Sequence, residues 1–199
     1  MCNLYRMTKA ASEVARLFDS EIGQVGNAGG EVYPGYPAMV VTDAVEGMHW
    51  GFPLVQKSKR TGEPLKPRPV NNTRTDKLSS PFWSASFRER RCLIPVSAWA
   101  EAEGAKGAKT RTWLSLPDTE LFACAGIWRD TAEWGRAFSM VMTDASEASA
   151  EVHDRMPVIV ARENWATWLS APADDARALC VPWAGDLAIE RTEQKWTRS

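Results

Sequence analysis

The fold class is decided by residues 110–143, TRTWLSLPDTELFACAGIWRDTAEWGRAFSMVMT. Turn-forming residues at 117–118 and 133–135 divide this stretch into three runs. Each run is rich in the apolar, aromatic and β-branched residues that favour strands. Strands joined by short turns pair in antiparallel fashion, so the stretch predicts consecutive strands of an antiparallel sheet. The predicted strands cover residues 110–116, 121–128 and 137–143.

Shorter patterns on either side predict the remaining elements. Helical spacing brings Val14, Leu17 and Phe18 to one face of a helix over residues 8–18. We expect an α+β fold with one domain over residues 1–199, in which short helices flank a curved, mostly antiparallel β-sheet core. Further helices are predicted over residues 82–90 and 163–169, and further short strands over 38–41, 48–52, 92–95 and 158–160.

Composition excludes several classes of protein. With 199 residues, 44% hydrophobic and 25% charged, the chain is typical of a globular protein and unlike disordered or fibrous sequences. No apolar run reaches the roughly 18 residues that span a bilayer, and no signal-peptide pattern follows Met1, so we expect a cytoplasmic protein. Two histidines and four scattered cysteines argue against a zinc site, and we expect no metal or other cofactor.

Charge is distributed unevenly along the chain. The net charge is −1, but residues 57–91 contain ten basic and three acidic residues, so this segment carries +7 and the remainder −8. A basic segment of this kind is typical of proteins that contact phosphate backbones. Residues 57–69 contain three prolines and predict a loop, so a solvated loop with scattered lysines stays open as the alternative.

Cys2 follows Met1, and a small side chain at the second position allows removal of an initiator methionine. The new first residue would then carry an α-amine and a thiol on adjacent carbons, with ordinary pKa values of about 8 and about 8.5. Such a pair reacts with an aldehyde in two steps, because the amine forms an imine and the thiol then closes a five-membered thiazolidine ring. A chance cysteine at a frayed terminus is the alternative.

Three other positions are candidates for proton transfer or binding. His153 lies ahead of a predicted strand, and its ordinary pKa near neutrality suits a proton shuttle. Glu101 and Glu103 are two residues apart and would share one face of a strand, where one carboxylate could serve as an acid or base. Asn72 lies in a polar run within the basic segment. Local turns and solvated glutamates would explain the same residues without a site.

Four motifs, taken in order, resemble the SOS response-associated peptidase (SRAP) family, whose members are understood as sensors of abasic sites in single-stranded DNA. The Trp-Gly strand at residues 48–51 is similar to that family as well, and the resemblance spans residues 2 to about 160. The motifs are Met1-Cys2, Asn72-Thr73-Arg74-Thr75-Asp76, Arg91-Cys92-Leu93-Ile94-Pro95 followed by Trp99-Ala100-Glu101, and His153-Asp154-Arg155-Met156-Pro157.

The resemblance implies a reaction and assigns residues to it. Cys2 would trap the ring-opened aldehyde of an abasic deoxyribose as a thiazolidine DNA–protein crosslink, which protects the lesion. Asn72 would position the cysteine and the sugar, Glu101 would move protons, and His153 would assist ring opening and imine formation. Glu103 stays open as a substitute for Glu101. An associated lyase activity and self-processing are further expectations.

The partner expected from the resemblance is single-stranded DNA containing an abasic site, bound by a monomer that is nucleoid-associated when on DNA. Phe82 and Trp83 are expected to stack on bases, whereas core packing explains most of the other tryptophans. Two alternatives stay open: a cysteine peptidase that uses Cys2 with His153 and Glu101, and a single-stranded DNA-binding module without chemistry. The residues expected to bind DNA are Arg74, Lys77, Phe82, Trp83, Arg88 and Arg155.

Overall fold

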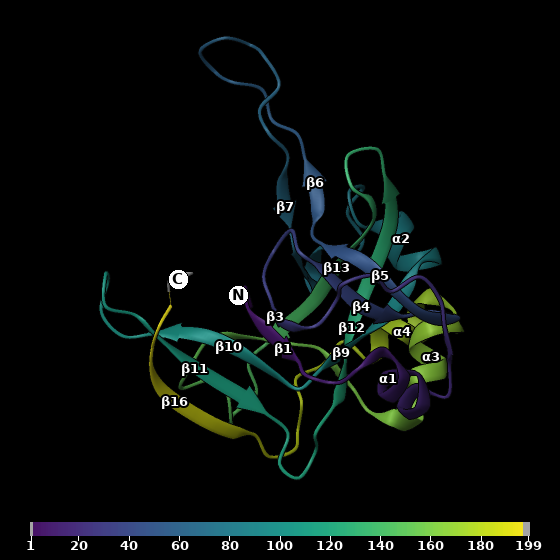
Figure 1. The fold of residues 1–199 in the computed structure, drawn as a ribbon, viewed down its shortest axis with the longest axis vertical. Coiled ribbons are helices and arrows are strands. Elements are labelled where there is room, and N and C mark those ends of the chain that lie inside the picture. The colour runs from purple at the N-terminus through teal and green to yellow at the C-terminus, as the bar shows by residue number, and fades with distance from the viewer. Residues whose placement is uncertain (1, 197–199) are drawn as a thin grey trace.

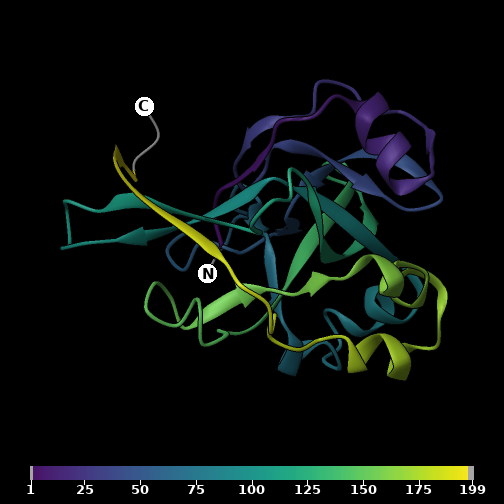
Figure 2. The same cartoon turned by 90° about the horizontal axis from the view of Figure 1, so that it is seen from below.

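The computed structural model describes residues 2–196, which form two large β-sheets, one β-hairpin and several short helices (Figure 1). Strands of the first sheet follow the order β16-β11-β10-β1-β3, and each neighbouring pair is antiparallel. Figure 2 shows β16, in yellow, along the outer edge of this sheet. The strands are β1 (Tyr5–Met7), β3 (Gly30–Val32), β10 (Ala98–Glu103), β11 (Thr110–Ser115) and β16 (Ala188–Lys195).

The second sheet curves until it closes on itself. Its main path runs β14-β13-β12-β9-β4-β5-β2, with β15 paired to β12 and β8 paired to β13. Because β13 pairs both with β12 and, in parallel, with β5, the strands β13-β12-β9-β4-β5 form a closed ring. The strands are β2 (Glu21–Ile22), β4 (Pro37–Val41), β5 (Ala44–Trp50), β8 (Asn72–Arg74), β9 (Arg91–Val96), β12 (Phe122–Thr131), β13 (Gly135–Asp144), β14 (Arg155–Pro157) and β15 (Ile159–Val160).

The predicted sheet agrees with the structure in its curvature and needs correction in its organisation. The strands divide between two sheets, and β13 pairs in parallel with both β5 and β8. These parallel pairings join segments that are distant along the chain, so local sequence patterns do not reveal them. The expectation of one domain over residues 1–199 stays a prediction.

Helix α1 begins later than the sequence pattern predicts. The backbone N–H and the hydroxyl of Thr8 both contact Ser97 Oγ, at 3.3 and 3.1 Å, so residue 8 belongs to the preceding connection. The Glu13 carboxylate accepts a hydrogen bond from the Ala10 N–H at 3.0 Å and thereby caps the first turn. The helices are α1 (Ala11–Phe18), η1 (Thr75–Lys77), α2 (Ser84–Glu89), η2 (Arg162–Asn164), α3 (Trp165–Ser170) and α4 (Ala173–Ala178).

A β-hairpin projects from the body at the top of Figure 1. Its base consists of β6 (Phe52–Leu54) and β7 (Arg68–Val70), which pair antiparallel, and the residues between them form the predicted loop. Gly51 precedes the hairpin with φ of +125°, and a Cβ at this position would lie 2.5 Å from Pro69 Cβ. Only glycine therefore fits where the two sides of the hairpin base approach each other.

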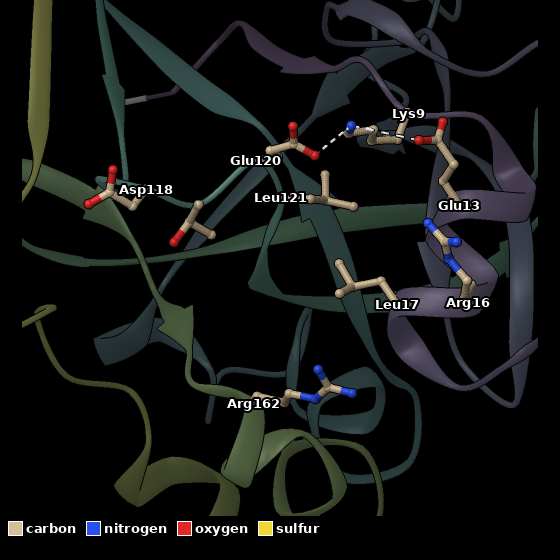
Figure 3. A pocket seen from close by; sticks show the side chains of 9 residues that line it. Lys9, Glu13, Arg16, Leu17, Asp118, Glu120, Leu121 and Arg162 are labelled. Atoms are coloured by element: carbon tan, nitrogen blue, oxygen red, sulfur yellow. Dashed lines mark ion pairs between the residues drawn. The ribbon is translucent and has the colours of Figure 1, made fainter.

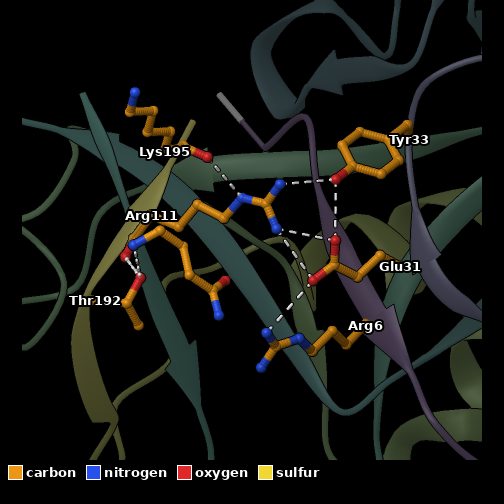
Figure 4. A network of polar contacts seen from close by, with 7 residues as sticks. Arg6, Glu31, Tyr33, Arg111, Thr192 and Lys195 are labelled. Carbon is orange, nitrogen blue, oxygen red and sulfur yellow. Dashed lines mark hydrogen bonds and ion pairs between the residues drawn. The ribbon is translucent and has the colours of Figure 1, made fainter. Parts of the chain in front are cut away.

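A polar network connects the N-terminal strand β1 to its neighbours (Figure 4). The Arg111 guanidinium donates to both carboxylate oxygens of Glu31 at 3.1 and 2.9 Å, and to the Tyr33 hydroxyl at 3.0 Å. Arg6 of β1 donates to the same carboxylate at 3.4 Å. Arg111 Nε also donates to the Lys195 carbonyl at 3.2 Å, so one side chain links β11 to β3 and β16. The network holds β1 in place, and with it the residues that precede β1.

Five of the ten tryptophans are buried and four more are partly buried against the core, in agreement with the expectation of core packing. Trp50, Trp99 and Trp168 are fully buried, and the buried cluster contains residues of both large sheets. Trp168 Nε1 donates to the Cys92 carbonyl at 2.8 Å, which satisfies its polar group inside the core. Trp165 is only partly buried and stacks on Phe18 with ring centroids 4.2 Å apart.

In residues 2–196, no helix is both long enough and apolar enough to cross a membrane.

Candidate active site

Cys2 lies fully buried beside the strand that carries Glu101. Its thiol donates to the Leu4 carbonyl at 3.4 Å. The chain then continues into β1, where Tyr5 pairs with Trp99 of β10. The Ala100 N–H donates to the Leu4 carbonyl at 2.9 Å, which extends this pairing toward residue 2. The chain is therefore held against β10 by backbone hydrogen bonds from Leu4 onward, two residues after Cys2.

Two asparagines hold the backbone of Cys2. Asn72 Nδ2 donates to the Cys2 carbonyl at 2.6 Å, and Asn71 Nδ2 donates to the same oxygen at 3.1 Å. Asn71 also contacts Asn3 Oδ1 at 3.1 Å. The sequence analysis identified Asn72 and missed Asn71, whose signal was its place beside Asn72 in the same polar run. Asn72 Oδ1 is buried and has no hydrogen-bond partner among residues 2–196, so it can accept a bond from a ligand.

Glu101 is the buried carboxylate of the site. Its side chain is 3% exposed, and its Oε2 lies 3.8 Å from His153 Nε2. Burial raises the pKa of Glu101 to about 7, because the charged form loses hydration. A carboxyl group with this pKa exists in both protonation states near neutral pH, as proton transfer in either direction requires.

The hydrogen-bond partner of His153 Nδ1 depends on whether the imidazole ring is neutral or charged. Nδ1 accepts a hydrogen bond from the Arg155 N–H at 3.0 Å, which assigns the proton of the neutral ring to Nε2, the nitrogen that faces Glu101. Asp154 Oδ1 lies 2.8 Å from Nδ1 and can accept a proton from the charged ring. Burial lowers the pKa of His153, so the neutral form predominates at neutral pH.

The Cys2 thiol is protonated in this environment. Burial raises its pKa well above the ordinary value, and the negative charge of Glu101 raises it further. A thiolate is therefore not the resting form, and attack by sulfur requires a group that takes the proton as the bond forms. Glu101 is a carboxylate close enough to influence that proton.

Glu103 shares a face of β10 with Glu101, as predicted, but has structural partners. The Thr112 hydroxyl donates to its carboxylate, and Arg191 Nε lies 3.3 Å from Glu103 Oε2. Arg191 also pairs with Glu151 at 2.9 Å, in the segment that leads to His153. Arg191 thus connects β10 to the segment that leads to His153. Sequence reasoning missed it because β16 was not predicted.

The structure brings some of the predicted DNA-binding cations to the site. Arg74 pairs with β13 at Met142, and Arg155 pairs with the same strand at Asp144, so β8 and β14 flank one end of β13. Arg74 donates to both Asp76 carboxylate oxygens at 2.8 and 2.9 Å, and Arg155 lies 3.1 Å from Asp144. Lys77 approaches Asp76 at 3.7 Å. Arg88 is exposed on α2, on the other side of Figure 1 from the N-terminus.

The expectation of exposed stacking aromatics is wrong for Trp83. Its side chain is 7% exposed and packs against Phe52 and Phe82, with ring centroids at 5.2 and 4.6 Å. Phe82 is partly buried, and the Arg129 guanidinium lies 4.4 Å from its ring centroid. The hairpin base supplies Phe52 as an apolar partner, which explains why this aromatic pair turns inward.

Arg91 also departs from its expected role in a basic surface. It is 5% exposed, and its guanidinium donates to the carbonyls of Phe87 at 2.7 Å, Trp168 and Ala171. These bonds join β9 to the ends of α2 and α3. Arg91 therefore stabilises the body and contributes no exposed charge.

A surface pocket elsewhere contains charged side chains but no nucleophile (Figure 3). Its volume is about 440 Å³, and it lies between α1 and the turn that follows β11. Lys9 pairs there with Glu120 at 2.7 Å and with Glu13 at 3.6 Å, which neutralises much of its charge. In the described part of the chain, no group of three or more His, Cys, Asp or Glu side chains is placed to hold a metal ion.

Comparisons with known proteins identify similar sequences. A model of the family described as SOS response associated peptidase (SRAP) matches residues 1–195. Abasic site processing protein YobE of Bacillus subtilis (strain 168) is 27% identical over 149 residues, covering 70% of this chain and 66% of that protein. Abasic site processing protein YoqW of the same strain is 29% identical over 149 residues, covering 70% of this chain and 64% of that protein. The matches thus span slightly less than two thirds of these curated relatives.

Solved structures share the fold. A protein from Bacteroides thetaiotaomicron superposes with a TM-score of 0.79 at 21% identity, covering 96% of this chain and 91% of that one. A protein from Bordetella bronchiseptica gives a TM-score of 0.79 at 20% identity, covering 96% of this chain and 99% of that one. At these identities the likeness establishes the arrangement of strands and helices.

Proposed function

This chain belongs to the SOS response associated peptidase (SRAP) family, and we propose that it processes abasic sites in DNA by trapping their aldehyde on Cys2. The observation that carries the proposal is the grouping of Cys2 with Glu101, His153 and Asn72. The names of the relatives, which are abasic site processing proteins, support the substrate class. The reaction requires removal of Met1, which lies outside the described residues.

The proposed chemistry has two bond-forming steps. The α-amine of Cys2 adds to the aldehyde of the ring-opened deoxyribose, and loss of one water gives an imine. The thiol then adds across the carbon–nitrogen double bond, with its proton passing to nitrogen, and a thiazolidine results. Closure changes no mass, so the adduct equals the two reactants minus one water.

The side chains divide the proton transfers between them. Glu101, with a pKa raised to about 7, takes a proton from the amine or thiol and returns one to the departing water. His153 presents its Nε2 proton to the sugar oxygen, which favours the ring-opened aldehyde. Asn71 and Asn72 fix the Cys2 carbonyl, so the amine and thiol face the sugar in one orientation. The contacts of Glu103 with Thr112 and Arg191 favour Glu101 for the catalytic role.

The proposed substrate is single-stranded DNA containing an abasic site, bound by a monomer in the cytoplasm or nucleoid. Arg74, Lys77 and Arg155 would contact phosphates near the site, whereas Arg88 on α2 and the partly buried Phe82 would contact DNA farther from Cys2. Strand cleavage by elimination from the imine is a further activity that the same intermediate allows.

A cysteine peptidase is the second candidate, favoured by the pair formed by His153 and Glu101 near Cys2. Such an enzyme needs a thiolate stabilised by a nearby base. The raised pKa of the buried Cys2 thiol opposes that requirement, whereas aldehyde trapping begins with the amine. Self-removal of Met1 is the peptidase reaction that fits this placement.

Replacing the nucleophile tests the proposal. Cys2→Ser keeps the amine but lacks the thiol, so it should form no heat-stable adduct with an abasic oligonucleotide while still giving an imine that borohydride traps. Denaturing gels measure both products. Cys180→Ser is the matched control, because Cys180 is a partly buried thiol that donates to the Ala176 carbonyl of α4, and this variant should behave as the wild type does. A heat-stable adduct from Cys2→Ser would contradict ring closure by the thiol.

A further inference from the structure

We propose that the arm, residues 54–68, binds the phosphate backbone of DNA that flanks the lesion, and this inference rests on the proposed function. The arm is the hairpin between β6 and β7 that projects from the body in Figure 1. It would extend the DNA contact beyond the reaction site without taking part in the chemistry.

Unneutralised charge distinguishes the arm from the rest of the basic segment. The arm contains one acid, Glu63, and none of its basic side chains forms an ion pair with another described residue. Outside the arm, Asp76 neutralises Arg74 and Lys77, and Glu89 pairs with Arg90 at 3.0 Å. Apart from Arg88 on α2, the free positive charge of the segment is therefore on the arm, at Lys57, Lys59, Arg60, Lys66 and Arg68, all of them exposed.

The backbone of the arm is a hairpin supported by its own hydrogen bonds. The Leu65 N–H donates to the Gln56 carbonyl at 2.7 Å, and the Ser58 N–H donates to the Glu63 carbonyl at 2.8 Å. Leu65 is 49% exposed, so this apolar side chain is not covered by the body. An extended basic element of this kind presents its cations to a partner rather than to its own protein.

The place of the arm relative to the site defines what it can reach. Its second strand, β7, ends at Val70 and is followed directly by Asn71 and Asn72, which hold the Cys2 carbonyl. DNA whose lesion lies at Cys2 therefore passes the base of the arm. About seven residues on each side, at about 3.3 Å each, give a reach of roughly 20 Å. The arm is therefore long enough to lie along several nucleotides of flanking DNA.

Charge complementarity identifies DNA as the partner. Each phosphate carries one negative charge, and a row of cations along a hairpin can pair with successive phosphates without reading sequence. The exposed apolar side chains at Leu54, Val55 and Leu65 lie among the cations, where they can contact sugars or base faces. An acidic protein would meet the same cations, and the experiment below separates the two partners.

The test compares two abasic oligonucleotides, one with about three and one with about fifteen nucleotides on each side of the lesion. The variant is Lys59→Gln/Arg60→Gln/Lys66→Gln, and the matched control removes three exposed cations elsewhere, as Arg16→Gln/Lys106→Gln/Arg162→Gln. Measurements are the dissociation constant over a range of salt and the crosslinking rate at saturating DNA. Because these side chains are exposed, both variants should fold normally, and thermal melting checks this.

The arm variant should bind the long oligonucleotide about 10- to 100-fold more weakly at low salt, with a salt slope smaller by about 2, since three phosphate contacts are lost. Its affinity for the short oligonucleotide and its saturated crosslinking rate should match those of the control. An equal loss of affinity for both oligonucleotides would overturn the inference. So would unchanged affinity for the long oligonucleotide, which is the result expected if the arm binds an acidic protein. Absence of crosslinking by the wild type on either oligonucleotide would instead contradict the proposed function.

Discussion

At the scale of single residues, burial moves the pKa values of Glu101 and His153 in opposite directions. It raises the pKa of Glu101 to about 7 and lowers that of His153, because loss of hydration disfavours the charged form of each. Glu101 therefore keeps its proton to a higher pH than His153 does, which reverses the ordinary order of these two groups. This pairing gives the site both an acid and a base near neutral pH.

The raised pKa of Glu101 predicts a pH dependence of stability. An acid with a folded-state pKa above its unfolded value binds more protons when folded, so stability is full below about pH 4.5 and falls as pH rises to about 7. In the wild type this titration should lower the unfolding free energy by up to about 3 kcal/mol between these pH values. Glu101→Gln lacks the titrating group, so its unfolding free energy should not show this decrease. Urea unfolding at pH 4 to 8 measures it. Glu103→Gln, two residues along β10, is the control and should retain the loss; an equal effect of both substitutions would contradict the assignment.

Residues that act at the site were only partly predictable from sequence. Cys2, Asn72, Glu101 and His153 were identified through motifs, and the structure brings them together from β10, β8 and two connections. Asn71 was missed because the sequence does not show which of two adjacent asparagine side chains will donate a hydrogen bond to the Cys2 carbonyl. The sequence also does not show that Glu103, rather than Glu101, forms an ion pair, because its partner Arg191 lies on the distant strand β16.

At the scale of elements, the base of the arm couples the hairpin to the site. Gly51 and Pro69 approach so closely that a side chain at residue 51 would displace β7. β7 leads directly into Asn71 and Asn72, so any displacement passes to the groups that hold Cys2. The position of Cys2 thus depends on a backbone contact at the hairpin base.

Gly51→Ala should consequently impair both stability and reaction. We expect a loss of about 1–3 kcal/mol in unfolding free energy, from the positive φ and the contact with Pro69, together with slower crosslinking in the folded protein. Gly62→Ala is the matched control, because Gly62 has φ of +75° but nothing within 4 Å of its Cβ position. It should lose some stability and crosslink at the wild-type rate. Normal crosslinking by Gly51→Ala would show that the hairpin base does not position the asparagines.

Element prediction succeeded where a run buries several apolar residues. The strands β12 and β13 are almost continuously buried over their central residues, and their apolar runs identified them. β16, Ala188–Lys195, lies at the edge of the first sheet with six of its eight residues exposed, so its sequence resembles a solvated segment. The predicted helix over residues 163–169 agrees with η2 and α3, because Trp168 is buried against β9.

At the scale of the whole molecule, net charge conceals where positive charge is exposed. The chain has 24 Lys and Arg against 25 Asp and Glu. The cations of the arm are nevertheless exposed, and they form no ion pair with another of residues 2–196. A local field of this kind attracts polyanions even when the protein as a whole is nearly neutral. Asn71 and Asn72 follow the arm directly and hold the Cys2 carbonyl, so in our proposal DNA bound along the arm brings a lesion to Cys2.

The intact mass of the product shows whether Cys2 traps the aldehyde of an abasic site. The purified full chain is incubated with single-stranded DNA containing one abasic site, and the product is weighed and then mapped by peptide digestion. The account predicts one adduct, equal to the chain without Met1 plus the oligonucleotide minus one water, attached at Cys2. No adduct from a chain shown to lack Met1, or an adduct carried by a lysine, would contradict aldehyde trapping by the terminal amine and thiol.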